Sequence, residues 1–291
     1  MKTLFLLSLV LRPPLGLDLY MPVPEANPLT PSKIALGRKL FNDKRLSFDG
    51  TLACVSCHDP KLAFSDGRSV ARGINGAEGA RSSPAIVNRG YGRTFFWDGR
   101  AKSLEQQALE PILNPKELGM TAAEAERRTG LKIAEITGAL ASYVRTIRSG
   151  DSRFDQYAAG DAWALSDVEK AGLEVFRGKA RCNTCHAGPN FSDENFHNTG
   201  VAWRDGKIVD PGAGEGKFKV PTLREVERTA PYMHDGSLAT LEDVVDYYDK
   251  GGNANPSLDE EIRPLHLAAD EKQSLIAFLR TLSGKIREGG R

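Results

Sequence analysis

The chain has 291 residues, of which 40% are hydrophobic, and its 39 basic and 38 acidic side chains leave a net charge of +1 at pH 7. The length allows one large or two ordinary domains, and the balanced charge argues against a nucleic-acid partner. No apolar run is long enough for a membrane span, and 29 glycines with 16 prolines are typical of a loop-rich globular protein.

Residues 1–19 are predicted to form a leader segment. Met1-Lys2 precedes an apolar run from Leu4 to Leu11, which Arg12 closes; this is the pattern of a short secretory signal. An alternative is a wrongly assigned start that truncates a longer leader. Both interpretations predict export to the periplasm.

All four cysteines lie in two copies of one motif, Cys54-Val55-Ser56-Cys57-His58 and Cys182-Asn183-Thr184-Cys185-His186. Cys-x-x-Cys-His is the attachment site of c-type haem: the thiols bond the porphyrin and the histidine becomes the proximal iron ligand. The alternatives are a structural zinc site or redox-active dithiols. Two distant pairs, each with its own histidine, favour two haem c groups, whose attachment outside the cytoplasmic membrane agrees with export.

The sequence around each motif is repeated. Gly37 and Phe41 precede the first motif and Gly172 and Phe176 the second, four residues apart on one face of a predicted helix. After the motifs, residues 139–147 and 274–282 match in their apolar positions, at helical spacing.

The repeat predicts a mainly α protein with two cytochrome c-like haem domains in tandem, connected by long loops. The N-terminal domain is predicted to span residues 20–160 and the C-terminal domain residues 161–291. In each, the first and last helices should cross beside the haem, and the closing helices are expected to stop at Gly150 and Gly284.

The supply of axial ligands differs between the two predicted domains. A six-coordinate haem passes electrons, whereas a five-coordinate haem binds and activates a small molecule. Between Asp59 and Arg181 there is no histidine, and Met120 is the only methionine. An open first iron is therefore predicted, with Met120, a lysine, a tyrosine or a residue of the other domain as alternatives.

The second domain offers several candidates for a sixth ligand, and spacing alone does not choose among them. Tyrosinate is a known haem ligand, and Tyr248 belongs to a helix predicted to start at Thr240. The candidates are His197, His234, His266, Met233, Tyr247 and Tyr248.

Further motifs resemble the bacterial dihaem cytochrome c peroxidase family, which includes the MauG enzymes. They are Phe96-Trp97-Asp98-Gly99-Arg100, Leu104-Glu105-Gln106-Gln107-Ala108, Pro221-Thr222-Leu223-Arg224 and Thr229-Ala230-Pro231-Tyr232-Met233-His234-Asp235-Gly236. The resemblance covers residues 25–285. It implies a peroxidatic N-terminal haem and a C-terminal haem that stores and relays electrons.

The resemblance also implies roles for single residues. Gln107 and Glu117 would line the distal face of the first haem near Pro111, and Trp97 would lie between the haems. The sixth ligand of the second haem would be Tyr248, as in the MauG-type, tyrosine-ligated branch.

Two positions depart from the family pattern. The family's calcium site maps to Ser82 and the carbonyls of Thr229 and Pro231, but Ser82 stands where the family usually has asparagine. Ala180 stands where MauG has a surface tryptophan that draws electrons from its protein substrate.

The predicted function is that of a periplasmic dihaem peroxidase or oxidase of MauG type. It would use hydrogen peroxide at the first haem and relay oxidising equivalents to a small cytochrome, a cupredoxin or a protein substrate. One alternative is a cytochrome c peroxidase that removes peroxide with a small cytochrome as donor. The other is a non-enzymatic dihaem electron carrier.

Overall fold

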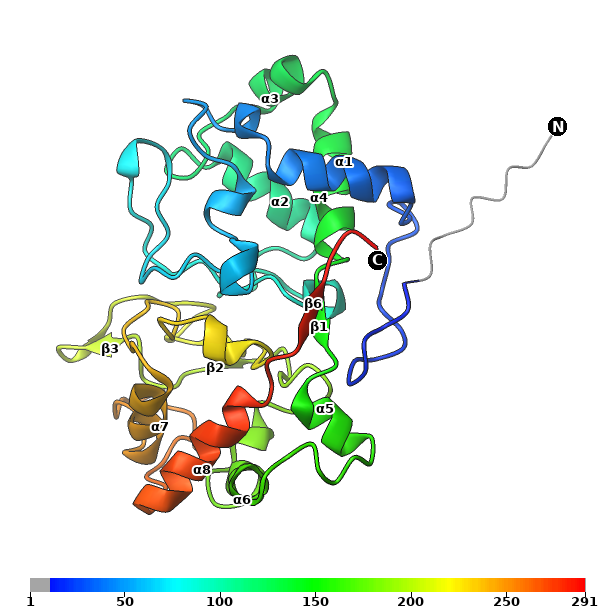
Figure 1. The fold of residues 1–291 in the computed structure, drawn as a ribbon. Helices are drawn as coiled ribbons and strands as arrows, with labels where there is room; N and C mark the ends of the chain where they lie inside the picture. Colours follow the sequence, from blue (N-terminus) through cyan, green and yellow to red (C-terminus); the bar gives the residue numbers. More distant parts are fainter. Residues whose placement is uncertain (1–10, 291) are drawn as a thin grey trace.

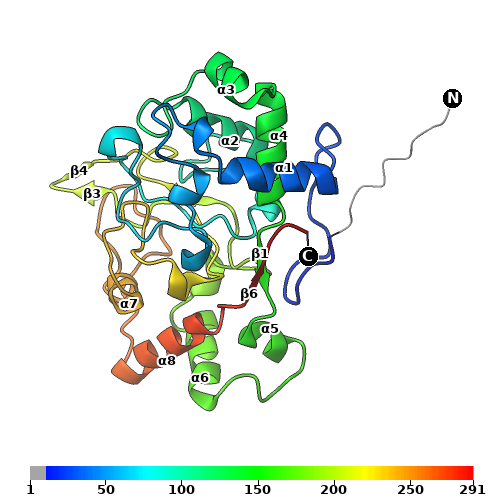
Figure 2. The same ribbon diagram turned by 45° about the horizontal axis from the view of Figure 1, so that its top comes forward.

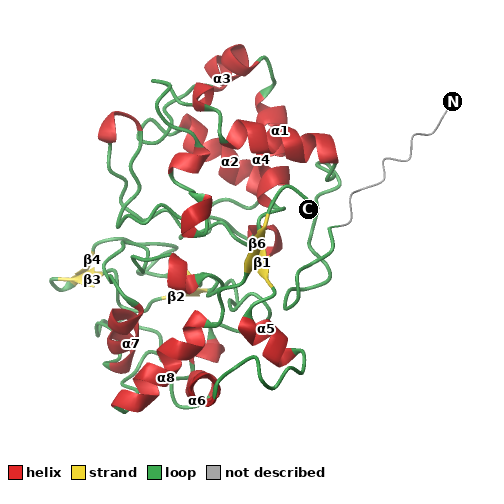
Figure 3. Cartoon of the chain, in the orientation of Figure 1, coloured by secondary structure: helices red, strands yellow, loops and turns green. Residues whose placement is uncertain are grey.

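The computed structural model describes residues 11–290, in which helices and long loops predominate and strands are short (Figure 3). The helices are α1 (Pro31–Phe41), α2 (Leu104–Leu113), α3 (Ala122–Thr129), α4 (Ile133–Val144), α5 (Arg153–Ala158), α6 (Asp167–Arg177), α7 (Leu241–Asp249) and α8 (Ala269–Arg280). The strands are β1 (Arg148–Gly150), β2 (Phe196–His197), β3 (Trp203–Arg204), β4 (Lys207–Ile208), β5 (Phe218–Lys219) and β6 (Lys285–Arg287). The predicted mainly α class is confirmed.

The helices gather in two groups, which we call the N-terminal half (α1–α4) and the C-terminal half (α5–α8) (Figure 1). In the N-terminal half, α1 crosses α4 at Gly37 (Figure 2). A Cβ atom at Gly37 would collide with the carbonyl oxygen of Ala139, so the crossing requires glycine. Beside it, the rings of Phe41 and Tyr143 meet edge to face with centroids 5.2 Å apart.

The C-terminal half repeats this crossing between α6 and α8. A Cβ atom at Gly172 would collide with the carbonyl oxygen of Ser274, and the ring centroids of Phe176 and Phe278 lie 5.1 Å apart. The predicted crossing of the first and last helices is therefore confirmed in both halves.

Each half has its own hydrophobic core. Phe41, Phe64 and Leu140 belong to the first core, and Leu173 and Phe278 belong to the second. Helix α5 packs against the second core, although the predicted boundary at residue 160 assigns it to the first domain. The boundary itself stays a prediction.

The expected helix stops at Gly150 and Gly284 are wrong. Helices α4 and α8 end earlier, at Val144 and Arg280, and the chain then continues into β1 and β6. These strands pair antiparallel between the two halves, with Gly150 opposite Lys285 (Figure 1). The chain after β6 returns to the N-terminal half, where Glu288 bonds Tyr143 and Arg38. The physical reason for the error is that both glycines serve this strand pair: a Cβ at Gly284 would collide with the Gly150 carbonyl oxygen.

The predicted leader is only partly described, because residues 1–10 lie outside the described residues. Its described part contacts the body of the protein: the Leu15 N–H donates to Asp151 over 2.9 Å, and the Gly16 carbonyl accepts from Arg224 over 2.8 Å. No helix of the described part of the chain combines the length and the apolar character needed to cross a membrane.

Candidate haem sites

Both attachment motifs open onto one cavity of about 1070 Å³, at the upper end of the range for ligand sites. Motif residues on its wall are Cys54, Cys57, His58, Cys182, Cys185 and His186. Burial raises the pKa of Cys54 and of Cys182 to about 12. Buried thiols on one cavity, each pair followed by its own histidine, suit the formation of thioethers with haem.

The two motif histidines are held in the same way. Nδ1 of His58 lies 3.0 Å from the Phe64 carbonyl oxygen, and Nδ1 of His186 lies 2.9 Å from that of Phe191. Both phenylalanines have a left-handed backbone, with φ of 62° and 50°. Burial lowers the pKa of both imidazoles. A neutral ring that donates from Nδ1 keeps the Nε2 lone pair for iron, so the residues fit c-type haem.

The N-terminal half contributes Gln107, Pro111 and Glu117 to the cavity wall. The Asn114 amide donates to a Glu117 carboxylate oxygen over 2.7 Å, and the Glu117 carbonyl accepts from the Ile74 N–H over 2.9 Å. Burial raises the pKa of Glu117 above its ordinary value. A carboxyl group that is fixed in place and has a raised pKa is suited to accept and return a proton.

Helices α2 and α7 occupy equivalent places in the two halves. Each follows a hydroxyl N-cap, Ser103 or Thr240, and Pro111 and Tyr248 both stand seven residues after the first residue of their helix. Both side chains line the cavity. Proline has no atom that can ligate iron, whereas tyrosine offers a phenolic oxygen. Burial raises the pKa of Tyr248.

The other candidate ligands differ in whether they line the cavity. Met120 lies in the first core rather than on the cavity wall, so the structure does not support it as a ligand of the first haem. The Tyr247 hydroxyl donates to the Thr199 carbonyl over 2.8 Å, and neither Tyr247 nor His266 lines the cavity. Met233 and His234 do line it, as does Tyr248.

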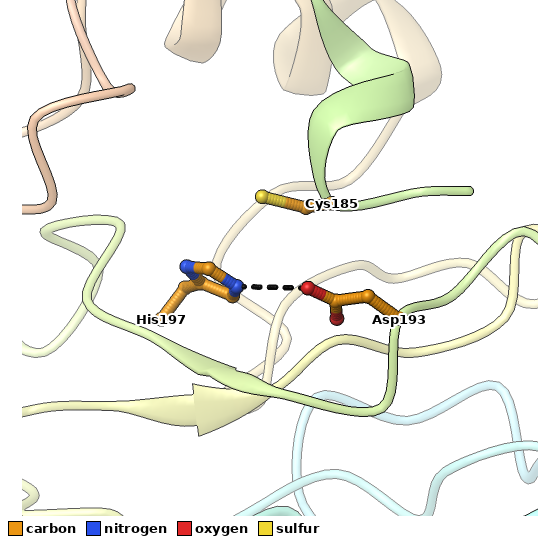
Figure 4. Close-up of side chains that lie close together, drawn as sticks. All are labelled: Cys185, Asp193 and His197. Carbon is orange, nitrogen blue, oxygen red and sulfur yellow. Dashed lines mark hydrogen bonds and ion pairs between the residues drawn. The ribbon is translucent and has the colours of Figure 1, made fainter.

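His197 lies close to Cys185 and Asp193, within reach of a shared metal ion (Figure 4). Its Nε2 is 3.2 Å from the Asp193 carboxylate, and its Nδ1 bonds Asp259. The Cys185 sulfur and the carboxylates of Asp259 and Asp193 raise the pKa of His197 to about 10. Both ring nitrogens are engaged and Cys185 belongs to an attachment motif, so we interpret the group as a polar network beside the second motif.

Two reciprocal backbone hydrogen bonds join the halves. The Ser82 N–H donates to the His234 carbonyl over 2.7 Å, and the Lys219 N–H donates to the Trp97 carbonyl over 2.8 Å. Ser82 and Lys219 each stand two residues before a proline in the sequence, a signal that sequence reasoning missed. The Trp97 indole N–H donates to the Ser82 carbonyl over 3.0 Å. Trp97 is thus fixed at the junction of the halves.

Arg81 forms ion pairs at this junction, which sequence reasoning also missed. The Arg81 guanidinium donates to both Asp210 oxygens over 2.7 and 2.8 Å, and to Asp98 over 2.7 Å. Planar guanidinium suits such paired contacts. Because Asp98 follows Trp97 in the chain, the ion pair also holds the backbone that carries the indole.

The predicted calcium ligands all reach the cavity wall. They are Ser82, Thr229 and Pro231. The Ser82 hydroxyl donates to the Met233 carbonyl over 3.2 Å, which places it against the segment that carries the other two. A calcium ion there stays a prediction.

Two haem-attachment motifs on one cavity, each with an oriented imidazole, define a protein of the dihaem c-type class. The family described as "Di-haem cytochrome c peroxidase" matches residues 31–134. Methylamine utilization protein MauG of Methylorubrum extorquens is 40% identical, over 91% of this chain and 82% of that protein. Cytochrome-c peroxidase IdrP1 of a Pseudomonas species is 37% identical, over 94% and 86%.

A crystal structure of a MauG-like protein associated with microbial copper homeostasis is also similar. It superposes with a TM-score of 0.83 at 37% identity, over 92% of this chain and 94% of that one. The chain belongs to the dihaem cytochrome c peroxidase family. It is therefore an enzyme, an oxidoreductase that acts on peroxide, and the family implies two haem c groups.

Proposed function

We propose that the protein is a periplasmic dihaem oxidase of MauG type. It uses hydrogen peroxide at an open N-terminal haem, in the domain of residues 20–160. It relays oxidising equivalents through the haem of residues 161–291 to a protein or redox partner. The observation that carries the proposal is the contrast between Pro111 and Tyr248 at equivalent places on the cavity wall.

The residues of the N-terminal half provide the proton chemistry. When bound, haem supplies the electrons and the redox centre for cleavage of the peroxide O–O bond. Glu117 takes a proton from one peroxide oxygen and returns it to the other, so that water leaves. The Gln107 amide orients the peroxide from α2. The raised pKa of Glu117 and its bond from Asn114 support this assignment.

Trp97 and Tyr248 serve the second part of the reaction. Trp97 stands at the junction of the halves, held by Ser82, and we assign it to the path between the two haem sites. Tyr248 is assigned as the sixth ligand of the second haem. A tyrosinate oxygen carries negative charge, which stabilises a more oxidised centre better than a neutral thioether does.

A cytochrome c peroxidase with a small cytochrome or cupredoxin as donor is the second candidate. Ala180 favours it: at the position where the resemblance places the surface tryptophan of MauG, Ala180 is only 7% exposed and faces the cavity. Oxidation of a protein substrate by the MauG route would therefore need another surface residue. Both candidates share the chemistry of the first haem and the calcium ligands proposed at Ser82, Thr229 and Pro231.

The test is an absorption and electron-resonance spectrum of the oxidised holoprotein, with and without one equivalent of hydrogen peroxide. We expect one high-spin signal that disappears with peroxide and one low-spin signal. Tyr248→Met should change the low-spin signal to that of histidine–methionine ligation, and Tyr248→Phe should abolish it. Tyr247→Phe is the matched control, because its hydroxyl faces Thr199 instead of the cavity.

Two low-spin signals that do not change when peroxide is added would identify a non-enzymatic electron carrier. An unaltered low-spin signal in both Tyr248 variants would reassign the sixth ligand to Met233 or His234.

A further inference from the structure

Lys219 is a buried cation that faces the cavity at the junction of the halves. It is only 8% exposed, and it lines the cavity that both attachment motifs share. Strand β5 carries it, paired with β2 so that Lys219 lies opposite Phe196. Its N–H is fixed by the Trp97 carbonyl, so the backbone holds the side chain at the junction.

The Lys219 ammonium lacks a hydrogen-bond acceptor among residues 11–290. Its nearest anion is the Glu194 carboxylate, at 3.9 Å from Nζ. That carboxylate is already bound by the Arg89 guanidinium over 2.6 and 3.0 Å and by the Arg93 N–H over 3.2 Å. The Nζ atom is not one of the fully enclosed unpaired polar atoms of the described residues, so the ammonium is open to the cavity that Lys219 lines.

The charged side chains around Lys219 differ in whether they line the cavity. Of Arg89, Glu194 and Lys219, only the two cations line the cavity. This group of three therefore has one more cation than anions, and both of its cations are on the cavity side. Burial and the nearby Arg89 lower the pKa of Lys219 to about 7, which an anion on the cavity side would reverse.

We propose that Lys219 and Arg89 form a seat for a propionate carboxylate of haem at the junction of the two halves. The proposal rests on the proposed function only for the presence of the two haem groups. Haem carries its carboxylates on flexible arms at one edge of the ring, so an ammonium and a guanidinium on the cavity wall match it in charge and in hydrogen bonding.

The internal repeat relates Lys219 to Ser82. Lys219 occupies the position that Ser82 has in the first half, since both donate a backbone N–H across the junction and both stand two residues before a proline. Ser82 is the position where the resemblance places a calcium ion. One side of the junction would thus receive its cation from solution, and the other side carries it as Lys219.

The experiment measures the reduction potentials of both haems in the holoprotein by spectroelectrochemistry, together with the propionate-bending bands in resonance Raman spectra. The variants are Lys219→Gln and Lys219→Arg. The matched control is Lys217→Gln, two residues away, where the ammonium pairs with Glu215 over 3.0 Å and does not line the cavity.

In Lys219→Gln we expect a lower potential at one haem and a shifted propionate band, because a nearby positive charge disfavours the oxidised state of iron. Lys219→Arg should keep the potential and the propionate band near their wild-type values. Lys217→Gln should leave the potential and the band unchanged. If Lys219→Gln fails to load haem while Lys219→Arg loads it with wild-type potentials, the need for charge supports the seat.

Wild-type potentials and bands in Lys219→Gln would overturn the proposal, and so would failure of both Lys219 variants to load haem, since shape rather than charge would then matter. These outcomes are separate from the proposed function. That function fails only if the wild-type protein lacks a high-spin haem that reacts with peroxide.

Discussion

The N-terminal and C-terminal halves share a framework and differ at the cavity wall. In both, a glycine lets two helices cross, a left-handed phenylalanine holds the motif histidine, and a helix with a hydroxyl cap runs along the cavity. At the same place on that helix, one half has Pro111 and the other Tyr248. Under the ligation that we propose, this single position determines whether the protein supplies a sixth ligand to the iron.

The largest effect is expected when the first half receives the oxygen donor that it lacks at this position. Pro111→Tyr should place a phenol beside the first iron, as we propose for Tyr248 beside the second. We expect the peroxide reaction to slow by about 10²–10⁴-fold or more, comparable with the loss of acid–base catalysis. Stopped-flow mixing with peroxide and the spin state of the first haem measure the effect.

Pro111→Ala is the control for that variant, because it removes the ring without adding a donor. It should react with peroxide at close to the wild-type rate. A Pro111→Tyr protein that remains high-spin and reactive would show that the equivalence of the two helices does not extend to the irons.

Glu117→Gln removes the carboxyl group that we propose as the proton carrier at the first haem. We expect a peroxide reaction slower by about 10²–10⁴-fold with both haems still attached. The base must be ionised, and burial raises the pKa of Glu117, so the wild-type rate should fall as pH drops through that raised pKa. The variant should lose this pH dependence.

Glu124→Gln is the matched control, since Glu124 pairs with Arg127 and Arg128 on α3 and does not line the cavity. It should react like the wild type. Equal rates in Glu117→Gln and Glu124→Gln would reject the role of Glu117 in proton transfer.

The two helix crossings should respond alike to an added methyl group. Gly37→Ala and Gly172→Ala each force a Cβ atom onto a backbone carbonyl oxygen. We expect each to lower the free energy of unfolding by about 3 kcal/mol, at the upper end of the range for overpacking. Urea denaturation measures it. In Gly138→Ala, on α4, the new atom would first meet the Asn27 side chain at 3.3 Å, so a much smaller change is expected.

The smallest expected difference between the halves is in the stability contributed by an ion pair that both halves contain. Glu105 bonds Arg145 over 2.7 Å, and the equivalent Glu242 lies 3.2 Å from Arg280. Arg145 is 4% exposed at its side chain, whereas Arg280 is 51% exposed. Glu105→Gln should cost about 2 kcal/mol of unfolding free energy, and Glu242→Gln about 0–1 kcal/mol. Equal losses in urea denaturation would contradict this assignment of burial.

The sequence was sufficient for features that local spacing encodes. The attachment motifs, the glycine and phenylalanine of each crossing helix and the matching closing helices are all short patterns. They require no knowledge of which distant segments meet. Gln107 and Glu117 were expected beside the first haem only through resemblance to a family, and the structure has both on the cavity wall.

Features that depend on contacts between distant segments could not be predicted. The shared position before a proline relates Ser82 to Lys219, but it does not indicate that Ser82 donates to the His234 carbonyl, or that Lys219 faces the cavity while Lys217 does not. Met120 could be set aside as an alternative ligand only once its place in the first core was known. Gly150 resembles a helix stop because its true partner, the strand at Lys285, lies far along the chain.

The pairing of β1 with β6 has a mechanical consequence. Segments joined by one linker are free to swing and twist about it. In the described part of the chain, β1 leads from the N-terminal half to the C-terminal half and β6 leads back, and the two strands pair antiparallel. A rotation of one half against the other would break the hydrogen bonds between these two strands. The spacing between the two haem-attachment sites is therefore set by covalent connectivity as well as by surface complementarity.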